Sequence, residues 1–408
     1  MVHPIRSAFL PPAECAHLDA EADSPMSPTF VFFRSVVLTL AVGLFLLASG
    51  SAARRPRAQV AFWATAALVH LVWWFLPELE GIWSQAGRWM VTIWVGALVT
   101  AVLLTVPFAL LLAGRWLLGR RMPAGTQAHG PRVQLLYVGL SLVVGIAVSF
   151  GTVGGPLVRE EVVQVSGLPE GLDGLRIANI GDVHVGPFIK PADLTAAVNL
   201  VNARKVDLLA ITGDLIDDLD QLEPTLDALE RSQALPVLSI LGNHDKYPNE
   251  AAIVAALKLR NPRIEVLINS SIQIHPRGVP LRVAGVDYPL AADGRHMLPR
   301  DEQDAAMLRF ADLAFAQMAP GEPLVVLSHH PEFFPIASAR GAILTLSSHT
   351  HGGQVRLFGR PVIAAYDYMH GIYREGNAYL DVSSGLGHWL PLRIGVPREI
   401  SIVTLRRG

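Results

Sequence analysis

Ile211-Thr212-Gly213-Asp214-Leu215-Ile216-Asp217 is an apolar run that is broken by a glycine and a carboxylate. The residues at 208–211 are all apolar, which is the pattern of a buried strand. Gly213 indicates a turn at the end of that strand. Because open α/β sheets bind their ligands beyond the carboxyl ends of the strands, Asp214 is predicted to lie at a functional edge of a sheet.

Four other stretches share this plan of apolar or small residues that lead into metal-binding side chains. They are Asn179-Ile180-Gly181-Asp182-Val183-His184, Ile240-Leu241-Gly242-Asn243-His244-Asp245, Val326-Leu327-Ser328-His329-His330 and Leu346-Ser347-Ser348-His349-Thr350-His351-Gly352-Gly353. Their donors are carboxylates, imidazoles and one carboxamide, a set that suits Mn, Fe or Zn. The chain has one cysteine, Cys15, which excludes a cysteine-ligated zinc site and an internal disulfide framework.

The chain of 408 residues has 51% hydrophobic and 17% charged residues, which is too apolar for a single soluble globular protein. The apolar excess lies before residue 155, and the remainder has a globular composition. A net charge of −2 and the lack of a basic stripe give no nucleic-acid binding surface. We predict a disordered tail at 1–28, a four-helix transmembrane region at 29–152 and a catalytic domain at 156–408.

Four apolar runs lie in the predicted transmembrane region, at residues 30–48, 60–76, 89–113 and 133–150. Each is long enough to cross about 30 Å of hydrocarbon as a helix. Buried core helices of a soluble protein are the alternative, but four such runs in succession would leave no polar face for solvent. The lipid bilayer is therefore an expected partner.

Arginine placement predicts the orientation of these helices. Seven arginines lie in the first and third connecting loops and one, Arg88, in the second; the seven are Arg54, Arg55, Arg57, Arg115, Arg120, Arg121 and Arg132. Basic loops face the cytoplasm, so four spans would place both termini outside it. An alternative begins at Met26 and treats 30–52 as a signal peptide cleaved near Gly50-Ser51-Ala52, which places the catalytic domain inside.

After Gly154-Gly155-Pro156 the pattern becomes that of an α/β domain. Helices are predicted at 191–204 and 222–232, between strands at 162–165, 175–180, 206–211 and 237–241. This alternation indicates βαβ units and a mostly parallel sheet. Seven more strands are predicted at 264–268, 272–274, 281–286, 324–327, 343–346, 379–382 and 399–405, enough for a second sheet stacked on the first.

The order of the motifs is Asp-x-His, Gly-Asp-x-x-Asp, Gly-Asn-His-Asp, His and His-x-His. Over residues 173–405 this order resembles the calcineurin-like metallophosphoesterase superfamily. Residues 347–354 and the run Ser383-Ser384-Gly385-Leu386-Gly387 are similar to its membrane-associated bacterial branch. The resemblance implies a four-layer αββα sandwich and a site for two divalent metal ions.

The resemblance also implies a role for each motif residue. Asp182, His184 and His351 would hold the first metal. Asn243, His329 and His349 would hold the second, and Asp214 would bridge the two ions. His244 would donate a proton to the leaving oxygen or stabilise the transferring phosphoryl group, with Asp245 holding its ring. Two ions about 3.5–4 Å apart would supply an attacking hydroxide and neutralise the phosphoryl oxygens.

Ser348 stands where the family has glycine. If that position needs a positive φ, the serine is strained and slightly shifts His349, which would weaken the second metal site. His330 is expected to be a supporting or exposed side chain. We expect ordinary structural roles for a further set of aspartates and histidines: Asp217, Asp218, His275, His296, His370 and His388.

The expected function is that of a membrane-anchored phosphohydrolase, most specifically a phosphodiesterase acting on envelope or lipid-linked phosphate esters. The alternatives are a phosphomonoesterase or pyrophosphatase facing the cytosol, and a membrane sensor or transporter with an accessory hydrolase domain. No predicted span contains an acidic residue, which disfavours the transporter. The loops at 287–304 and 356–373 are expected to select the substrate.

Overall fold

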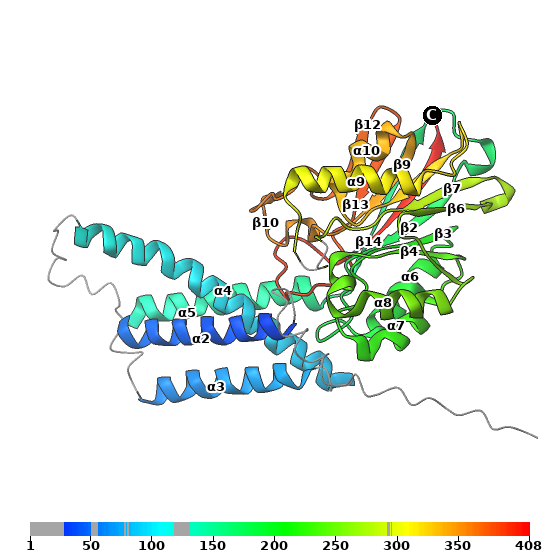
Figure 1. Cartoon of the computed structure of the whole chain (residues 1–408). Helices are drawn as coiled ribbons and strands as arrows, with labels where there is room; N and C mark the ends of the chain where they lie inside the picture. Colours follow the sequence, from blue (N-terminus) through cyan, green and yellow to red (C-terminus); the bar gives the residue numbers. More distant parts are fainter. Residues whose placement is uncertain are drawn as a thin grey trace, which may run out of the picture.

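The computed structural model describes residues 28–49, 56–76, 79, 81–117, 131–291, 294 and 296–408. Four long helices come first: α2 (Pro28–Ser49), α3 (Pro56–Trp74), α4 (Gly81–Leu117) and α5 (Pro131–Val153). They pack together and extend from one side of a globular region formed by residues 157–408 (Figure 1). The predicted tail lies outside the described residues apart from Pro28, as do Met26 and the alternative cleavage site.

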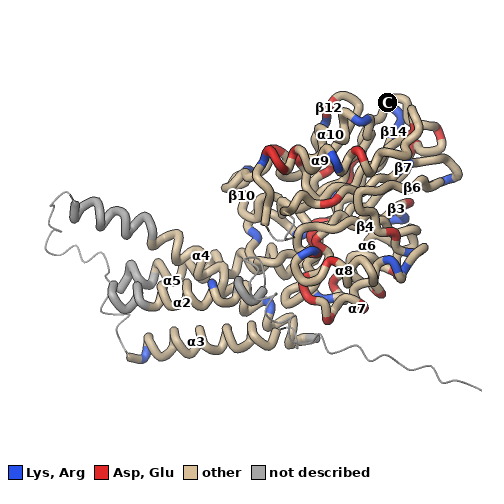
Figure 2. The backbone as a smooth tube through the Cα atoms, viewed as in Figure 1, with Lys and Arg blue, Asp and Glu red and all other residues tan. Residues whose placement is uncertain are grey.

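Two of these helices contain a segment long and apolar enough to cross a membrane, Ile82–Thr105 in α4 and Leu136–Val153 in α5. The apolar segment described in α2, Phe32–Gly43, is shorter than a span requires. In α3, polar residues such as Arg57 and His70 lower the hydropathy. The prediction of four spans was therefore wrong for the described residues, in which two helices qualify. Figure 2 shows few charged residues along these helices.

The first sheet has six strands in the order β1-β14-β2-β3-β4-β5. The strands are β1 (Leu157–Val165), β14 (Glu399–Arg407), β2 (Arg176–Ile180), β3 (Leu208–Thr212), β4 (Val237–Ile240) and β5 (Ile264–Val266). All neighbours are parallel except β14 and β2. The C-terminal strand thus lies between the first two strands, and the sheet is mostly parallel as predicted.

The second sheet has six strands in the order β12-β13-β9-β8-β7-β6. They are β12 (Gly371–Glu375), β13 (Ala378–Val382), β9 (Ala342–Ser347), β8 (Leu324–Leu327), β7 (Leu281–Gly285) and β6 (Ser270–Ile274). The four inner strands are parallel, and the two edge strands are antiparallel to their neighbours. A small hairpin of β10 (Arg356–Leu357) and β11 (Arg360–Pro361) stands apart from both sheets.

The two sheets stack face to face with a hydrophobic core between them, to which β2, β3, β4, β7, β8 and β9 contribute. The outer face of the first sheet is covered by α6 (Pro191–Ala203), α7 (Leu222–Leu229) and α8 (Asn243–Leu259). The second is covered by α9 (Arg300–Ala314) and α10 (Phe334–Ala339). The globular region therefore has four layers in the order αββα (Figure 1).

The helical region is attached to the globular region through packed side chains and an ion pair. Phe188 packs with Trp73 of α3 and Val91 of α4. Arg88 Nη1 lies 2.7 Å from Asp193 Oδ2 at the start of α6. The carbonyl of Phe188 accepts a second hydrogen bond from Arg88. These contacts fix one end of the helices against the globular region.

A buried ionic network joins the two sheets. Arg159 of β1 lies 2.6 Å from Asp381 of β13 and 3.0 Å from Glu399 of β14. The other oxygen of Asp381 accepts hydrogen bonds from Ser401 and from Asn179 Nδ2. Because Asn179 is near the end of β2, this network holds the strand ends that carry the site.

Candidate metal centre

The predicted ligands all lie at the carboxyl ends of parallel strands, where the two sheets meet. Asp182 and His184 follow β2, and Asp214 follows β3. Asn243 is the first residue of α8, directly after β4. The second sheet contributes the remaining ligands after β8 and β9: His329, His349 and His351. Every one of these side chains is buried except that of His349, which is half-buried.

The structure gathers these side chains into two groups. The ligand atoms of Asp182, His184 and His351 lie within 4.8 Å of one another, and so do those of Asp214, His329 and His349. Asp214 Oδ2 lies 3.2 Å from His329 Nε2 and 3.5 Å from His184 Nε2. Its carboxylate is therefore between the groups, where a bridging ligand would have to be.

Two buried oxygens support cation binding at these groups. Asp182 Oδ2 and Asn243 Oδ1 have no hydrogen-bond partner among the described residues. The amide nitrogen of Asn243 donates to Tyr247 at 3.2 Å, which leaves Oδ1 free to coordinate. Because a buried oxygen without a donor is costly, the two atoms fit a site for divalent cations.

The buried carboxylates of the cluster favour the binding of additional positive charge. Burial raises the pKa of Asp182 above its usual value, although His329 opposes that shift. Burial would also raise the pKa of Asp214, but His329 and His244 hold it well below its usual range. Burial disfavours a charged His329, yet the adjacent carboxylates raise its pKa to about 9. Divalent ions would provide this positive charge without protons.

Five of the predicted ligands have a left-handed backbone, which is uncommon for residues other than glycine. Their φ angles are 47° at Asp182, 51° at His184, 52° at Asp214, 73° at His349 and 47° at His351. Hydrogen bonds between the loops hold this conformation, as where the Asp182 amide donates to the Gly213 carbonyl and that of His184 to the Asp214 carbonyl. Such strain persists at sites where the surroundings over-determine the backbone.

The strain expected at Ser348 is absent. Its φ is not positive, and the left-handed residue is its neighbour His349. The hydroxyl of Ser348 donates to the carbonyl of Thr212 at 2.9 Å and lies 3.1 Å from His329 Nδ1. The serine therefore fits beside the second group of ligands and does not displace His349.

The ring of His244 contacts a different aspartate from the one expected. His244 Nδ1 lies 3.0 Å from Asp217 Oδ1, and Asp217 also lies 3.1 Å from His184 Nδ1. The Asp245 carboxylate instead accepts backbone N–H groups of Gly242, Leu215 and Ile216, so the expected role of Asp245 was wrong. Asp217 is the last residue of the Gly-Asp-x-x-Asp motif, and that spacing was the available signal for it.

Asp217 also changes the electrostatics around His244. Burial disfavours the charged form of His244, but Asp214 and Asp217 raise its pKa above the usual value. Burial would raise the pKa of Asp217, yet the two histidines beside it hold that pKa well below its usual range. His244 is therefore oriented through Nδ1 and favoured in its protonated form.

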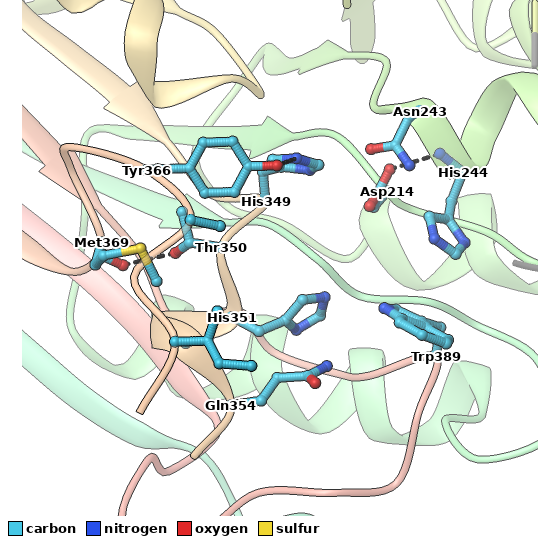
Figure 3. Close-up of a pocket in the computed structure, with 13 residues that line it drawn as sticks. Asp214, Asn243, His244, His349, Thr350, His351, Gln354, Tyr366, Met369 and Trp389 are labelled. Atoms are coloured by element: carbon cyan, nitrogen blue, oxygen red, sulfur yellow. Dashed lines mark hydrogen bonds between the residues drawn. The ribbon is translucent and has the colours of Figure 1, made fainter. Parts of the chain in front are cut away.

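A pocket of about 340 Å³ opens over the two groups. In Figure 3, Asp214, His244, His349 and His351 surround it together with Tyr366 and Trp389. Two tyrosines that the sequence did not single out approach His349 Nε2, Tyr366 at 2.8 Å and Tyr288 at 3.1 Å. His330 is buried against the rings of Tyr288 and His349, and is a supporting side chain.

The loop of residues 383–387 packs against the first group of ligands. Leu386 donates to the Gly181 carbonyl at 2.9 Å, and Gly387 donates to the Asp182 carbonyl at 2.7 Å. A Cβ atom at Gly387 would lie 1.8 Å from the carbonyl oxygen of Val183, closer than any real contact. The glycine is therefore required for the loop to reach Asp182.

We predict that Gly387→Ala will lower the free energy of unfolding by about 1–3 kcal/mol or more and reduce metal binding, because the added methyl displaces Val183 and the ligands beside it. Unfolding by denaturant and metal content after dialysis would measure both effects. Gly155→Ala is the matched control, since its Cβ would meet no atom within 4 Å. Equal stability and metal content in the two variants would contradict this role of Gly387.

Comparisons with known proteins agree with the geometry of the site. The family model described as Calcineurin-like phosphoesterase matches residues 175–366. The chain is 29% identical to the uncharacterized metallophosphoesterase YkuE of Bacillus subtilis over 60% of this chain and 84% of that protein. It is 30% identical to an uncharacterized metallophosphoesterase of Helicobacter pylori over 57% of this chain and 60% of that protein.

A third relative is the transmembrane protein with metallophosphoesterase domain of Danio rerio, which is 28% identical over 62% of this chain and 58% of that protein. The chain therefore spans less than two thirds of the length of the Helicobacter pylori and Danio rerio relatives. The matched residues include the two groups of ligands, which follow strands of both sheets. Residues 175–366 therefore form a calcineurin-like phosphoesterase domain, a type of domain found in metal-dependent hydrolases of phosphate esters.

Proposed function

We propose that the chain is a membrane-anchored phosphodiesterase that hydrolyses lipid-linked phosphate esters of the cell envelope. The observation that carries the proposal is the place of Trp389. Its ring lines the pocket 6.0 Å from the ring of His244, and the same side chain packs against the cluster formed by α3 and α4. A pocket that adjoins the membrane helices favours substrates held at the membrane. Residues 29–152 would be the anchor, and residues 156–408 the catalytic domain.

The proposed mechanism assigns a task to each group of ligands. Asp182, His184 and His351 would hold one divalent ion, and Asn243, His329 and His349 the other, with Asp214 shared. The bound ions would supply a water-derived nucleophile near neutral pH and neutralise the phosphoryl oxygens. The buried oxygens of Asp182 and Asn243 that lack donors support this assignment.

His244 is proposed to protonate the leaving oxygen of the ester. Asp217 holds its Nδ1, so the other ring nitrogen is the one available to a substrate in the pocket. A histidine oriented by a carboxylate is a common arrangement for general acid catalysis. His244 is thereby a proton donor, and the metal ions do not depend on it as a ligand.

The domain is proposed to face the outside of the cytoplasmic membrane. The loop between the two candidate spans contains Arg115, Arg120, Arg121 and Arg132, and a basic loop favours the cytoplasmic side. The residues that follow α5 would then emerge on the opposite side. The two candidate spans of α4 and α5 are sufficient for this orientation.

We predict that Asp214→Ala abolishes hydrolysis and lowers the metal content, because one shared carboxylate serves both groups of ligands. Turnover of a generic phosphodiester and metal per chain would be measured on the purified full chain. Asp218→Ala is the control, since its carboxylate caps a short helix by accepting from Asp220. Full activity of Asp214→Ala at unchanged metal content would refute the bridging role.

We predict that His244→Ala lowers turnover by about 10²–10⁴-fold for esters with poor leaving groups and less for activated aryl esters, which need no proton. The metal content should stay at the wild-type value. Asp217→Asn should show the same dependence on the leaving group, because it removes the carboxylate charge that favours the protonated ring of His244. An equal loss for both kinds of ester would indicate charge stabilisation instead of proton donation.

We predict that alkaline phosphatase fused to the C-terminus is active in cells and that green fluorescent protein fused there is dark, because the chain after α5 is exported. Fusions after Leu117, in the basic loop, are the control and should give the opposite pair of results. A fluorescent and phosphatase-inactive C-terminus would place the domain in the cytoplasm. The substrate would then be sought among cytosolic phosphomonoesters and pyrophosphates.

A further inference from the structure

The hairpin of β10 and β11 exposes an apolar tip, which we define as residues 357–363. Its exposed side chains are Leu357 (54%), Phe358 (105%), Val362 (57%) and Ile363 (73%). They are four of the eleven large apolar side chains exposed among the described residues of 157–408. The tip has one charged residue, Arg360. Soluble monomers seldom expose such a contiguous apolar patch, and a patch of this kind marks an interaction site.

The backbone holds this tip in a defined shape. Phe358 and Gly359 have φ angles of 52° and 78°, so both central residues of the two-residue turn are left-handed, as in a type I′ turn. A bulky aromatic residue is an outlier in that conformation. Arg356 secures the turn by donating to the Gly359 carbonyl at 2.7 Å and lies 3.0 Å from His370 Nδ1. The aromatic ring is thus held outward by a fixed hairpin.

The base of the hairpin is connected to the membrane end of α5. The Arg356 amide donates to the Ile394 carbonyl at 2.8 Å, and the Ile394 amide donates to the Gln354 carbonyl at 2.9 Å. The neighbouring Arg393 packs on α5, where a Cβ at Gly151 would lie 2.8 Å from the Arg393 carbonyl oxygen. Gly151 belongs to the candidate span Leu136–Val153.

The hairpin also points in the direction that membrane insertion requires. In Figure 1, β10 projects from the globular region toward the side on which α2 to α5 extend. The apolar tip is therefore on the side of the globular region from which the two candidate spans extend.

We propose that residues 357–363 insert into the headgroup layer of the membrane crossed by α4 and α5. Leu357, Phe358, Val362 and Ile363 would enter the boundary between headgroups and acyl chains. Arg360 would remain at the lipid phosphates, because arginine keeps its charged end in the polar layer while its stem lies among apolar groups. The partner is the lipid headgroup layer itself.

The insertion would give the pocket direct access to lipid substrates. Ile363 belongs to the apolar tip and also lines the pocket, together with Met369 and Trp389. An amphiphilic ester would keep its apolar part against these side chains while its phosphate reaches Asp214 and the histidines. This consequence rests on the proposed function, whereas the insertion itself does not require the chain to be active.

Depth-dependent quenching tests the insertion directly. Cys15 is the one native cysteine, so Phe358→Cys in a Cys15→Ser background accepts a single environment-sensitive fluorophore. The labelled full chain is reconstituted into vesicles of phosphatidylglycerol and phosphatidylethanolamine that contain doxyl-labelled acyl chains. Leu313→Cys is the control, because Leu313 is 62% exposed and lies near the C-terminal end of α9. Arg300, at the other end of α9, is the residue that pairs with Asp367 in the loop after the hairpin.

We expect several-fold stronger quenching at position 358 than at position 313. Equal quenching at the two positions overturns the proposal. The proposal is also overturned if quenching by lipid at position 358 is weak and self-quenching there rises with protein density. That result would assign the tip to contact with a second copy of the chain.

A second measurement separates this inference from the proposed function. Leu357→Ser/Phe358→Asn keeps the turn, since asparagine tolerates a left-handed backbone, but removes the apolar side chains. We expect a several-fold loss of hydrolysis for a lipid phosphodiester in vesicles and no change for a soluble aryl phosphodiester. Phe358→Trp, which keeps an aromatic side chain at the tip, should retain the wild-type activity on vesicles. Strong quenching of the fluorophore at position 358, together with a wild-type chain that hydrolyses neither substrate, would refute the proposed function and leave the insertion standing.

Discussion

The structure depends on placing several buried carboxylates and histidines at one joint edge of two sheets. Such a cluster is unfavourable unless positive charge accompanies it, as the raised pKa of His329 and the unpaired oxygens of Asp182 and Asn243 indicate. The backbone adds to the cost, since five of the ligands are left-handed. The free energy of metal binding would offset both the burial of these groups and the strain of the left-handed backbone.

The surrounding structure is arranged to keep these loops in place. Gly213 and Gly242 approach so closely that a Cβ at Gly213 would lie 2.6 Å from the Gly242 amide nitrogen. Gly385 is equally constrained, because its Cβ would lie 2.6 Å from that of Asp182. Beneath the loops, Arg159 and Asp381 tie the sheets together. The glycines of the loops and the ion pair between the sheets thus hold the same strand ends in place.

Much of the fold could be predicted from the sequence because its strands are short apolar runs that stop at turn residues. The expected strand at 237–241 appears as β4, Val237–Ile240, and the expected helix at 191–204 as α6, Pro191–Ala203. The helix α8 was missed, because its first turn is formed by the polar motif that begins at Asn243 and Pro248 lies inside it. The second-sheet edge strand β12, Gly371–Glu375, was missed because it begins within the stretch 356–373 that was interpreted as a loop.

The candidate site could be predicted only in part from the sequence. The motif order was sufficient to name the residues of both groups, but it could not tell which aspartate faces His244. Asp217 and Asp245 are both close to His244 in the fold, but the His244 ring bonds to Asp217, whereas backbone amides such as that of Gly242 bond to Asp245. Ser348 could not be judged either, because the left-handed position is one residue further on. Both outcomes depend on φ angles and amide directions, which side-chain identity does not determine.

The attachment of the domain to the helices bears on what the pocket can reach. Arg88 pairs with Asp193, and Trp73 packs on Phe188, so the domain is held against the helices by contacts and not only by the connection after α5. A flexible tether would let the pocket sample many heights above a membrane. Packed contacts instead fix one height and one direction. A site fixed in this way gains nothing for a freely diffusing substrate, but it gains effective concentration for an ester confined to the headgroup layer.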